Sequence, residues 1–258
     1  MISFTVVTCT YNAEGELQRT VDSVLEQTFP FIEHLILDGA SKDGTLQIAN
    51  EYKQLSDESD NGHVVKVVSE PDNGLYDAMN KGIRMATNEY LIFLNAGDGF
   101  PSPETLDDVH ASFADGEAHP GVLYGYADIV NNDGLFLRHR RLQSPSRLSW
   151  RSFKQGMLVC HQSFYARTDL ARLCPYDLQY RYSADVDWCI RIMKEGEHKH
   201  LPLKNVGIVL VNYLEGGMSI QNHRASLYER FRVMRHHYGL FTTLIMHLWF
   251  IIRGVIKR

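Results

Sequence analysis

The first hundred residues of the chain alternate short apolar runs with segments of helical periodicity. Four of the runs are rich in β-branched and aromatic residues, a composition typical of strands buried on both faces. These runs are ISFTVVTC, HLILD, VVKVVS and YLIFLN. Between them, apolar residues recur at helical spacing within residues 17–25, 43–55 and 76–86. The alternation predicts an α/β fold with a mostly parallel sheet and crossover helices.

The second half of the chain has a less regular pattern. GVLYGYADIV, HQSFYAR and NVGIVLVNY are typical of strands, and a helix is predicted from Ala184 to Lys194. We therefore expect a mixed sheet in this half. Because no internal repeat or long linker interrupts the chain before about its last forty residues, we expect one main domain over residues 1–219 and a helical tail over residues 220–258.

The charge balance argues against nucleic acid as a partner. Charged residues make up 22% of the chain, and the formal net charge is -5. Nucleic-acid binders usually need a basic surface to neutralise phosphates. The four cysteines, at positions 9, 160, 174 and 189, show no CxxC spacing and suit a reducing compartment. Because the N-terminus has no basic n-region and no long apolar core, we expect it to begin the first strand of a cytoplasmic protein.

Polar side chains follow the first two predicted strands. Ligands of such sheets bind outside the carboxyl ends of the strands, so these side chains are candidate binding residues. Thr8, Tyr11 and Asn12 lie at the first strand-to-helix turn, where a planar base can stack on Tyr11. Asp38 ends the second strand and can accept a hydrogen bond from a base N–H, and Asp43 is a candidate N-cap of the next helix. Each segment taken alone is equally compatible with an ordinary turn and helix cap.

Two more polar segments follow the third and fourth predicted strands. EPDNGLYDAMNKG carries Asp77, Asn80 and Lys81 over the first turns of a helix, although Asp77 and Lys81 also have the i,i+4 spacing of a solvated ion pair. FLNAGD ends in Asp98, which is either a turn residue or a carboxylate ligand for a hard cation. As a strand-end residue outside the core, Asp98 is expected to contribute little to stability.

These motifs, taken in order, resemble those of the family 2 glycosyltransferases of the GT-A fold, which transfer a sugar from a nucleotide donor with inversion. The matching segments are VVTCTYN, DGASKDGT, EPDNGLYDAMNKG, FLNAGD and SADVDWCIRI, and the resemblance covers residues 2–219. The HQSFYAR and GGMS segments are similar to those of exopolysaccharide enzymes such as the colanic acid biosynthesis glycosyltransferases. The resemblance implies a nucleotide-binding, Rossmann-like mixed sheet, with a donor half at residues 1–100 and an acceptor half at residues 101–219.

The resemblance also implies roles for individual residues on the donor side. Asp98 is expected to hold Mn²⁺ or Mg²⁺ on the donor diphosphate, with His161 or His223 as a candidate further ligand. The family pattern has one acidic residue at position 95 and another at 97 or 98, whereas this chain has Asn95 and Gly97 and keeps only Asp98. The residues expected to bind the donor, a UDP-sugar by resemblance, are Thr8, Tyr11, Asn12, Asp38, Asp77, Asn80 and Asn95.

Asp185, in SADVDWCIRI, is the candidate general base for the acceptor hydroxyl. It lies at the start of a helix anchored by apolar residues, far along the chain from the strand tips assigned to the nucleotide. The family usually has Glu-Asp where this chain has Ala184-Asp185. Asp187 is the rival base, and a first-turn carboxylate that complements the helix dipole is the structural alternative. The paired glycines of LEGGMSI, residues 214–220, fit a loop that closes over the donor.

Two other functions fit parts of the pattern, and a third does not. A glycoside hydrolase also needs paired carboxylates but has no use for DGASKDGT at a strand tip. A non-catalytic nucleotide-sugar binding module needs only the Tyr11 and Asp38 side of the site. A dinucleotide dehydrogenase is disfavoured because no G-x-G-x-x-G follows the first strand. The full set of motifs favours transfer to a glycan or lipid-linked acceptor in surface polysaccharide biosynthesis.

Residues 240–252 of the tail, LFTTLIMHLWFII, are apolar nearly all round the predicted helix. The segment is too short to span a bilayer, which takes about 20 residues. Because Arg224, Arg230, Arg232 and Arg235 lie just upstream, we expect a peripheral helix on an anionic cytoplasmic membrane face, near a lipid-linked acceptor. The alternative is a terminal helix that packs on the core or on a second copy of the chain. The sequence leaves the oligomeric state open.

Overall fold

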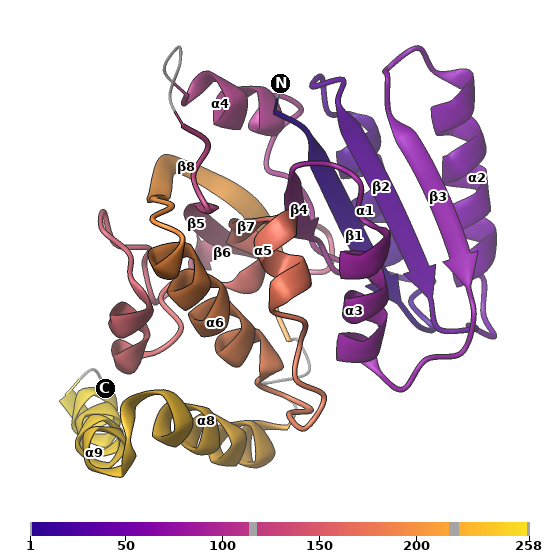
Figure 1. The fold of residues 1–258 in the computed structure, drawn as a ribbon. Helices are drawn as coiled ribbons and strands as arrows, with labels where there is room; N and C mark the ends of the chain where they lie inside the picture. The colour runs from indigo at the N-terminus through magenta and orange to yellow at the C-terminus, as the bar shows by residue number, and fades with distance from the viewer. Residues whose placement is uncertain (1, 114–117, 217–221, 257–258) are drawn as a thin grey trace.

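The computed structural model describes residues 2–113, 118–216 and 222–256, and its strands form one mixed sheet (Figure 1). The first half contains β1 (Phe4–Thr10), α1 (Leu17–Leu25), β2 (Ile32–Asp38), α2 (Thr45–Glu58), β3 (Val64–Ser69), α3 (Leu75–Met85), β4 (Tyr90–Phe93) and α4 (Thr105–Ala111). The second half contains β5 (Val122–Val130), β6 (Phe136–His139), the 3-10 turns η1 (Trp150–Gln155) and η2 (His161–Ser163), β7 (Phe164–Arg167), α5 (Thr168–Leu173), α6 (Ala184–His198), β8 (Leu203–Leu214), α8 (His223–Tyr238) and α9 (Leu240–Ile256). The expected α/β fold is confirmed.

The strands lie in the order β3-β2-β1-β4-β7-β5-β6, and β8 pairs with β5. Strands β1 to β4 are all parallel. Strand β7 runs antiparallel to both β4 and β5, β6 runs antiparallel to β5, and β8 runs parallel to β5. The sheet is therefore parallel in its first half and mixed in its second, as the sequence predicts.

The carboxyl ends of the first three strands lie side by side. Thr10 is the register partner of Asp38, and Asp38 is the register partner of Ser69. Figure 1 shows the arrowheads of β2 and β3 pointing to the same end of the molecule. The loops that follow these strands consequently lie together, as expected for a site at the carboxyl edge of a parallel sheet.

Both faces of the sheet are covered by helices because the central strands carry apolar side chains on both sides. Val7 and Leu35 pack in the same cluster as buried residues of α3, α5 and α6. Ile36 and Val65 pack instead with buried residues of α1 and α2. This double-sided packing fixes β1 and β2 and therefore holds the loops at their carboxyl ends in place.

Three local predictions differ from the structure. Strand β3 is not buried on both faces, because it lies at an edge of the sheet; Val64 is 53% exposed. HQSFYAR is not all strand, since its first three residues form the turn η2. Asp43 is not the N-cap of α2, which begins at Thr45 with Gly44 in that position, although the Asp43 carboxylate accepts the Thr45 N–H at 3.1 Å.

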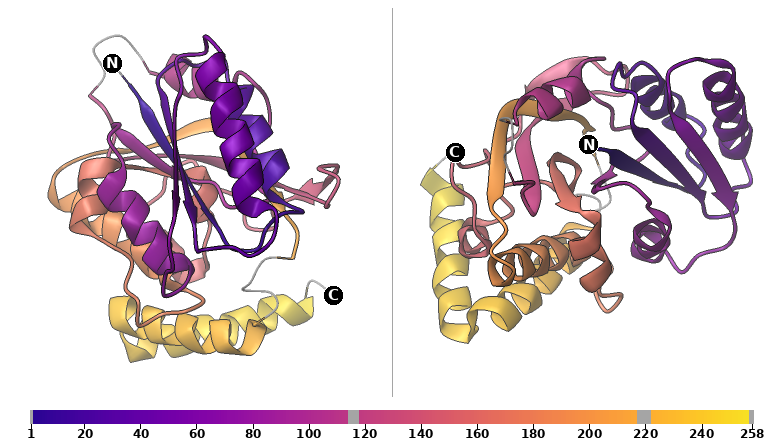
Figure 2. Two further views of the ribbon diagram at one scale, coloured as in Figure 1. Left: turned by 90° about the vertical axis from the view of Figure 1, so that its right-hand side faces the viewer. Right: turned by 45° about the horizontal axis from the view of Figure 1, so that its top comes forward.

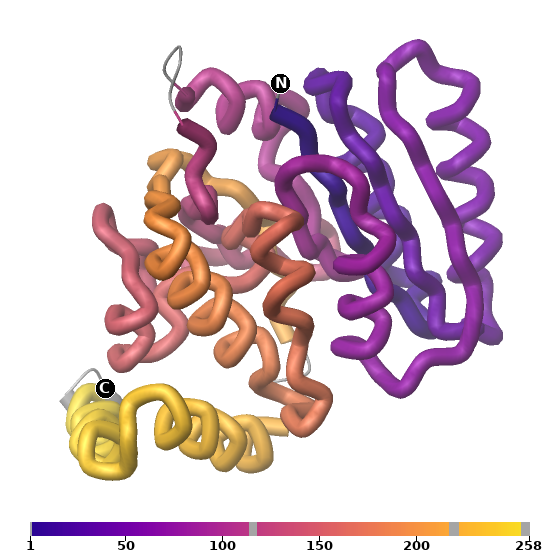
Figure 3. Tube along the Cα trace, in the orientation of Figure 1, coloured from indigo at the N-terminus to yellow at the C-terminus, as the bar shows by residue number. Residues whose placement is uncertain are grey.

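The tail forms two helices that lie together at one end of the molecule (Figures 1 and 2). Helix α8 packs against α6, and α9 packs against α8 and η1. The Tyr238 ring stacks on Trp150 of η1 with centroids 5.7 Å apart. Figure 3 shows the trace of α8 passing close to the start of α6. No helix within the described residues is long and apolar enough to cross a membrane.

Candidate active site

An exposed aromatic ring lies at the carboxyl edge of the sheet, immediately after β1. Tyr11 is 64% exposed. Its ring passes so close to Gly39 that a Cβ at that position would lie 3.3 Å from Tyr11 Cδ2 and 2.9 Å from Asp72 Oδ2. The absence of a side chain at position 39 therefore lets Tyr11 and Asp72 approach each other. Asn12 is next to Tyr11, and its Oδ1 accepts the Lys42 N–H at 2.9 Å, which ties the loop after β1 to the loop after β2.

Thr8 and Asp38 are buried, and their polar atoms bond to other protein groups. The Thr8 hydroxyl donates to the Leu94 carbonyl at 2.7 Å and lies 2.9 Å from His34 Nε2. The Asp38 carboxylate accepts hydrogen bonds from the Ser41 N–H at 3.1 Å and from the Ser69 hydroxyl at 2.6 Å. These bonds hold the strand tips together, and the expected contact of either side chain with a base stays a prediction.

Thr10 is a candidate residue that sequence reasoning missed. It is the last residue of β1, is 5% exposed, and has a buried hydroxyl oxygen with no partner among the described residues. A buried hydroxyl normally finds a hydrogen-bond partner, so an unpaired one beside Tyr11 suits contact with a ligand. The sequence feature that points to Thr10 is its position at the end of the first predicted strand.

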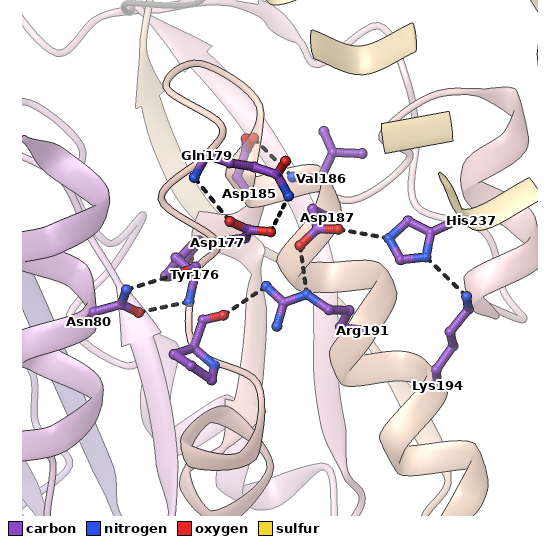
Figure 4. A network of polar contacts seen from close by, with 11 residues as sticks. Asn80, Tyr176, Asp177, Gln179, Asp185, Val186, Asp187, Arg191, Lys194 and His237 are labelled. Atoms are coloured by element: carbon purple, nitrogen blue, oxygen red, sulfur yellow. Dashed lines mark hydrogen bonds and ion pairs between the residues drawn. The ribbon is translucent and has the colours of Figure 1, made fainter. Parts of the chain in front are cut away.

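Asn80 joins α3 to the segment that precedes α6. Its side-chain amide donates to the Tyr176 carbonyl at 2.9 Å and accepts the Tyr176 N–H at 2.7 Å (Figure 4). Both ends of the amide are therefore used within the protein. The sequence does not reveal this contact, because Tyr176 lies 96 residues away along the chain. The donor contact of Asn80 stays a prediction.

Asp77 closes the first turn of α3. Its carboxylate accepts the backbone N–H of Asn73 at 3.0 Å and the Asn73 side-chain amide at 3.1 Å. The Asn73 N–H is the main reason that the pKa of Asp77 lies below its usual value. Lys81 pairs with Glu70 at 3.1 Å, and its amine also donates to the Pro71 carbonyl. The described contacts of Asp77 are thus those of a helix-start residue, and its donor contact stays a prediction.

Asp98 is buried, which corrects the expectation that it lies outside the core. Only 3% of the residue is exposed. Its Oδ1 accepts the Leu214 N–H at 2.9 Å, and its Oδ2 accepts a hydrogen bond from Gln162 Nε2 at 3.0 Å. Burial raises the pKa of Asp98 to about 6, although both hydrogen bonds and the nearby charges of His161 and Arg19 oppose the rise. The carboxylate is thus held at a fixed position but at an electrostatic cost.

Two buried amide oxygens near Asp98 have no hydrogen-bond donor among the described residues. They are Asn95 Oδ1 and Gln162 Oε1. Together with the Asp98 carboxylate they provide oxygen atoms from three side chains, and oxygen is the ligand that Mg²⁺ and Mn²⁺ prefer. Within the described residues no group of three or more histidines, cysteines, aspartates or glutamates forms a metal cluster. These three side chains therefore offer the type of ligand atom that a hard cation binds, but only one of them is a carboxylate.

Gln162 is a second site residue that the sequence does not mark, because HQSFYAR is typical of a strand. It lies in η2, immediately before β7, and β7 is the antiparallel neighbour of β4. This pairing brings η2 next to the end of β4, where Asn95 and Asp98 follow. The hydrophilic start of HQSFYAR was the only local signal.

His161, the first residue of η2, lies between Asn95 and Asp185. The distance from Asn95 Nδ2 to His161 Nε2 is 3.4 Å, and the distance from His161 Nδ1 to Asp185 Oδ2 is 3.6 Å. Because an ionised carboxylate only accepts hydrogen bonds, the nitrogen that faces Asp185, Nδ1, is the one that carries a proton in this contact. His223, by contrast, is an exposed residue at the start of α8, without a described contact to Asp98.

Asp185 lies in the first turn of α6 with its side chain 18% exposed. The Tyr76 hydroxyl lies 3.4 Å from its Oδ1, which also accepts the Val186 N–H at 2.9 Å. Burial alone raises the pKa of this carboxylate. The contact and charge of His161, the charge of Arg230 and the Val186 N–H outweigh burial, so the pKa of Asp185 lies below its usual value. The side chain is therefore ionised at neutral pH.

Asp187, the rival base, belongs to a buried network that joins α6 to α8 (Figure 4). Arg191 Nε donates to its Oδ2 at 2.6 Å, and His237 Nε2 donates to its Oδ1 at 2.8 Å. The other ring nitrogen of His237 lies 3.0 Å from Lys194 Nζ. Asp187 thus binds side chains of α6 and α8, whereas Asp185 Oδ2 lies 3.6 Å from His161 Nδ1 of η2.

Helix α8 also holds the backbone just before Asp185. The Glu229 carboxylate accepts three consecutive N–H groups, from Arg181 at 2.9 Å, Tyr182 at 2.7 Å and Ser183 at 3.0 Å. These groups precede the first turn of α6 and have no partner within that helix. The domain boundary expected at residue 219 therefore separates α8 from α6, although the two helices share buried polar contacts. Most of the expected closing loop LEGGMSI, residues 217–220, lies outside the described residues.

Comparisons with known proteins agree with this arrangement. Residues 5–173 match the model of glycosyl transferase family 2. The chain is 33% identical over 218 residues to the PGL/p-HBAD biosynthesis glycosyltransferase of Mycobacterium bovis, and the match covers 84% of this chain and 78% of that protein.

Solved structures share the fold. Residues 1–349 of Staphylococcus aureus TarS superpose with a TM-score of 0.69 at 17% identity, covering 96% of this chain and 72% of that one. TarS has also been solved in complex with UDP-GlcNAc. The mannosyltransferase PcManGT of Pyrobaculum calidifontis, in complex with GDP-Man and Mn²⁺, has a TM-score of 0.59 at 17% identity, covering 94% of this chain and 73% of that one. The sheet, the ordered strand-end motifs and the family match lead to one conclusion: the chain belongs to the family 2 glycosyltransferases, with a GT-A-like fold.

Proposed function

We propose that the protein transfers a sugar, with inversion, from a nucleotide-sugar donor to a hydroxyl group of a glycan or lipid-linked acceptor in surface polysaccharide or glycolipid biosynthesis. The observation that carries the proposal is the line of polar side chains from Asp98 through Asn95 and His161 to Asp185. This line starts at the strand edge, where nucleotides bind in such sheets, and ends at an ionised carboxylate.

On the donor side, Tyr11 is the proposed platform for the base, because its exposed ring lies at the strand edge. Thr10 is the proposed hydrogen-bonding partner of the nucleoside, because its buried hydroxyl has no partner among the described residues. A UDP-sugar is the first donor to test, since TarS binds UDP-GlcNAc, but a GDP-sugar belongs in the same panel because PcManGT binds GDP-Man. The Mycobacterium bovis relative is named as a PGL/p-HBAD biosynthesis glycosyltransferase, which supports a biosynthetic role for this chain.

On the acceptor side, Asp185 is the proposed general base. A carboxylate whose pKa lies below its usual value is ionised at neutral pH and can take a proton when the acceptor hydroxyl attacks. Attack on the face of the sugar opposite the leaving diphosphate inverts the anomeric carbon. His161 is the proposed positioning residue, because its Nδ1 faces the carboxylate and restricts where Asp185 can point.

A divalent cation, Mn²⁺ or Mg²⁺, is proposed at Asp98, with the amide oxygens of Asn95 and Gln162 as further ligands. When bound, it supplies positive charge that neutralises the donor diphosphate as it leaves. Because the protein offers one carboxylate, we expect the cation to bind weakly without nucleotide and more tightly with it.

The test compares Asp185→Asn with a matched surface variant, Asp177→Asn, in the same segment of the chain. Mass spectrometry of nucleotide-sugar turnover measures transfer, and calorimetry with UDP and Mn²⁺ measures binding. We expect Asp185→Asn to bind the nucleotide normally and to lose transfer by about 10²-fold or more. Asp177→Asn should keep the wild-type rate, since its partner Gln179 is an exposed neighbour. Full transfer by Asp185→Asn would exclude the proposed base.

A non-catalytic nucleotide-sugar binding module is the second candidate, and it is favoured by one observation. Positions 95 and 97 carry Asn and Gly, so the site has fewer acidic groups than the family pattern implies. The same assay separates the two functions. Tight nucleotide binding with neither transfer nor hydrolysis across the panel supports the module, and release of sugar from a glycan without nucleotide supports a glycoside hydrolase.

A further inference from the structure

Over residues 240–253, where the structure describes its side chains, helix α9 has an outer face of apolar side chains. Its members are exposed and lie on one side of the helix: Leu240, Phe241, Leu244, Ile245, Leu248, Trp249, Ile251 and Ile252. We call this set the α9 outer face. Because an α-helix turns by about 100° per residue, the α9 outer face covers about half of the helix circumference. Monomeric soluble proteins rarely leave so large a contiguous apolar patch open to water, so the patch calls for a partner.

The opposite side of α9 packs against the rest of the chain and fixes the direction of the outer face. Thr243 is fully buried. The His247 ring lies against Phe231 of α8, with centroids 5.1 Å apart. Arg253 Nη1 donates to the Gln155 carbonyl of η1 at 3.3 Å. Packing on the protein therefore accounts for the inner side of α9 and leaves the outer face uncovered.

The charge of the tail selects the kind of partner. Residues 222–258 contain seven lysines and arginines against one glutamate, a net charge of +6, whereas residues 1–221 carry -11. On α8, Arg224 and Arg235 are exposed and lie on the same side as Tyr228, which is 67% exposed. A second copy of the tail would bring like charges together, whereas anionic lipid headgroups attract them.

We propose that the α9 outer face docks on an anionic lipid surface, with the exposed Arg224 and Arg235 of α8 at the headgroups. Helix α9 has 17 residues and is about 25 Å long, so it would lie along the surface rather than cross it. Trp249 suits the boundary between headgroups and acyl chains. The proposal goes beyond the transfer reaction, and its test needs no turnover.

Docking on this face has a geometric consequence for the site. Helices α8 and α9 lie at the end of the molecule toward which β2 and β3 point (Figures 1 and 2). Binding through α9 would hold that end, with the strand-edge residues, near the lipid surface. An acceptor carried on a lipid would then meet the site without leaving the membrane.

The experiment is flotation of the full-length protein with phosphatidylcholine vesicles, with and without phosphatidylglycerol. We expect flotation with the anionic vesicles and little with phosphatidylcholine alone. Leu244→Glu/Leu248→Glu should reduce the bound fraction at least tenfold, because it places charge within the docking face. The matched control, Leu135→Glu/Leu137→Glu, changes two exposed leucines, one just before β6 and one within it, and should float as the wild type does. Arg224→Glu/Arg235→Glu should weaken binding to the anionic vesicles about tenfold or more.

Two results would overturn the proposal. Equal binding of the wild type and Leu244→Glu/Leu248→Glu to anionic vesicles would show that α9 is not the docking face. A lipid-free dimer that this variant converts to a monomer, with no flotation of the wild type, would assign the face to contact between two copies. Sedimentation measures the second outcome. Because both leucines are exposed, an unchanged melting temperature confirms that the variant is folded.

Discussion

Replacing Asp98 by Asn should stabilise the protein while removing metal-dependent activity. Burial raises the pKa of Asp98 from 3.8 to about 6, so the ionised carboxylate is disfavoured in the folded state. The difference of about two pH units corresponds to about 3 kcal/mol. Asn keeps an oxygen for the Leu214 N–H, and Gln162 can turn its unpaired Oε1 toward the new amide. We therefore expect the free energy of unfolding to rise by about 1–3 kcal/mol at neutral pH.

The effect of Asp98→Asn should depend on pH in one direction. Because the pKa of Asp98 is higher in the folded than in the unfolded state, the folded wild type takes up the proton first. Its stability therefore increases as the pH falls from 6 toward 3.8, and the advantage of the variant shrinks over that window. Above pH 6 the advantage should be at its full size.

The measurement is urea denaturation of both proteins in chelator at several pH values. Asp60→Asn is the control, because Asp60 is exposed and should change stability by no more than about 0.5 kcal/mol. A variant that is about 1 kcal/mol less stable than the wild type near neutral pH, or an advantage that does not vary with pH, would refute the reasoning. Full activity of Asp98→Asn in chelator would show that Asp98 is a structural turn residue only.

Three further substitutions test other features. Gly82→Ala should lower the free energy of unfolding, measured in urea, by about 1–3 kcal/mol, because the added Cβ would lie 2.6 Å from Val7 Cγ1. The control Gly15→Ala should not lower it, because no atom lies within 4 Å of a Cβ at that position. His237→Gln should flatten the pH dependence of stability. Burial lowers the pKa of His237, so the neutral ring stabilises the folded state above pH 6.5. This stabilisation is lost as the pH falls below 6.5, at up to about 1.4 kcal/mol per pH unit. Denaturation curves of the wild type and the variant at several pH values measure the loss. Tyr11→Ala should weaken UDP binding by about 1–3 kcal/mol in calorimetry, with an unchanged melting temperature, since the ring is 64% exposed.

The elements of the fold were predictable because their signals are local. Strand and helix periodicities gave the α/β alternation, and the irregular second half correctly indicated a mixed sheet. The pairing order was beyond the sequence, and so was the edge position of β3. VVKVVS is as apolar as a central strand, but only the fold decides that its outer side faces solvent.

The candidate site was predictable in part. Motifs at strand ends marked Tyr11 and Asp98, and a motif at a helix start marked Asp185. Gln162, by contrast, depends on the pairing of β7 with β4. Asp185 and Asp187 are two residues apart on one helix, so sequence cannot tell them apart. Their difference arises from His161 on one side and His237 on the other, which come from distant segments of the chain.

The contacts of α8 determine where the chain can be shortened. A soluble fragment that ends at residue 219 would lose Glu229 and His237, and with them the bonds that hold the start of α6. Gly239 separates the two tail helices and has a positive φ of 81°. A stop codon after Gly239 removes the apolar helix but keeps the groups that brace Asp185. Crystallisation and kinetic work on soluble protein should therefore begin from a fragment that ends there.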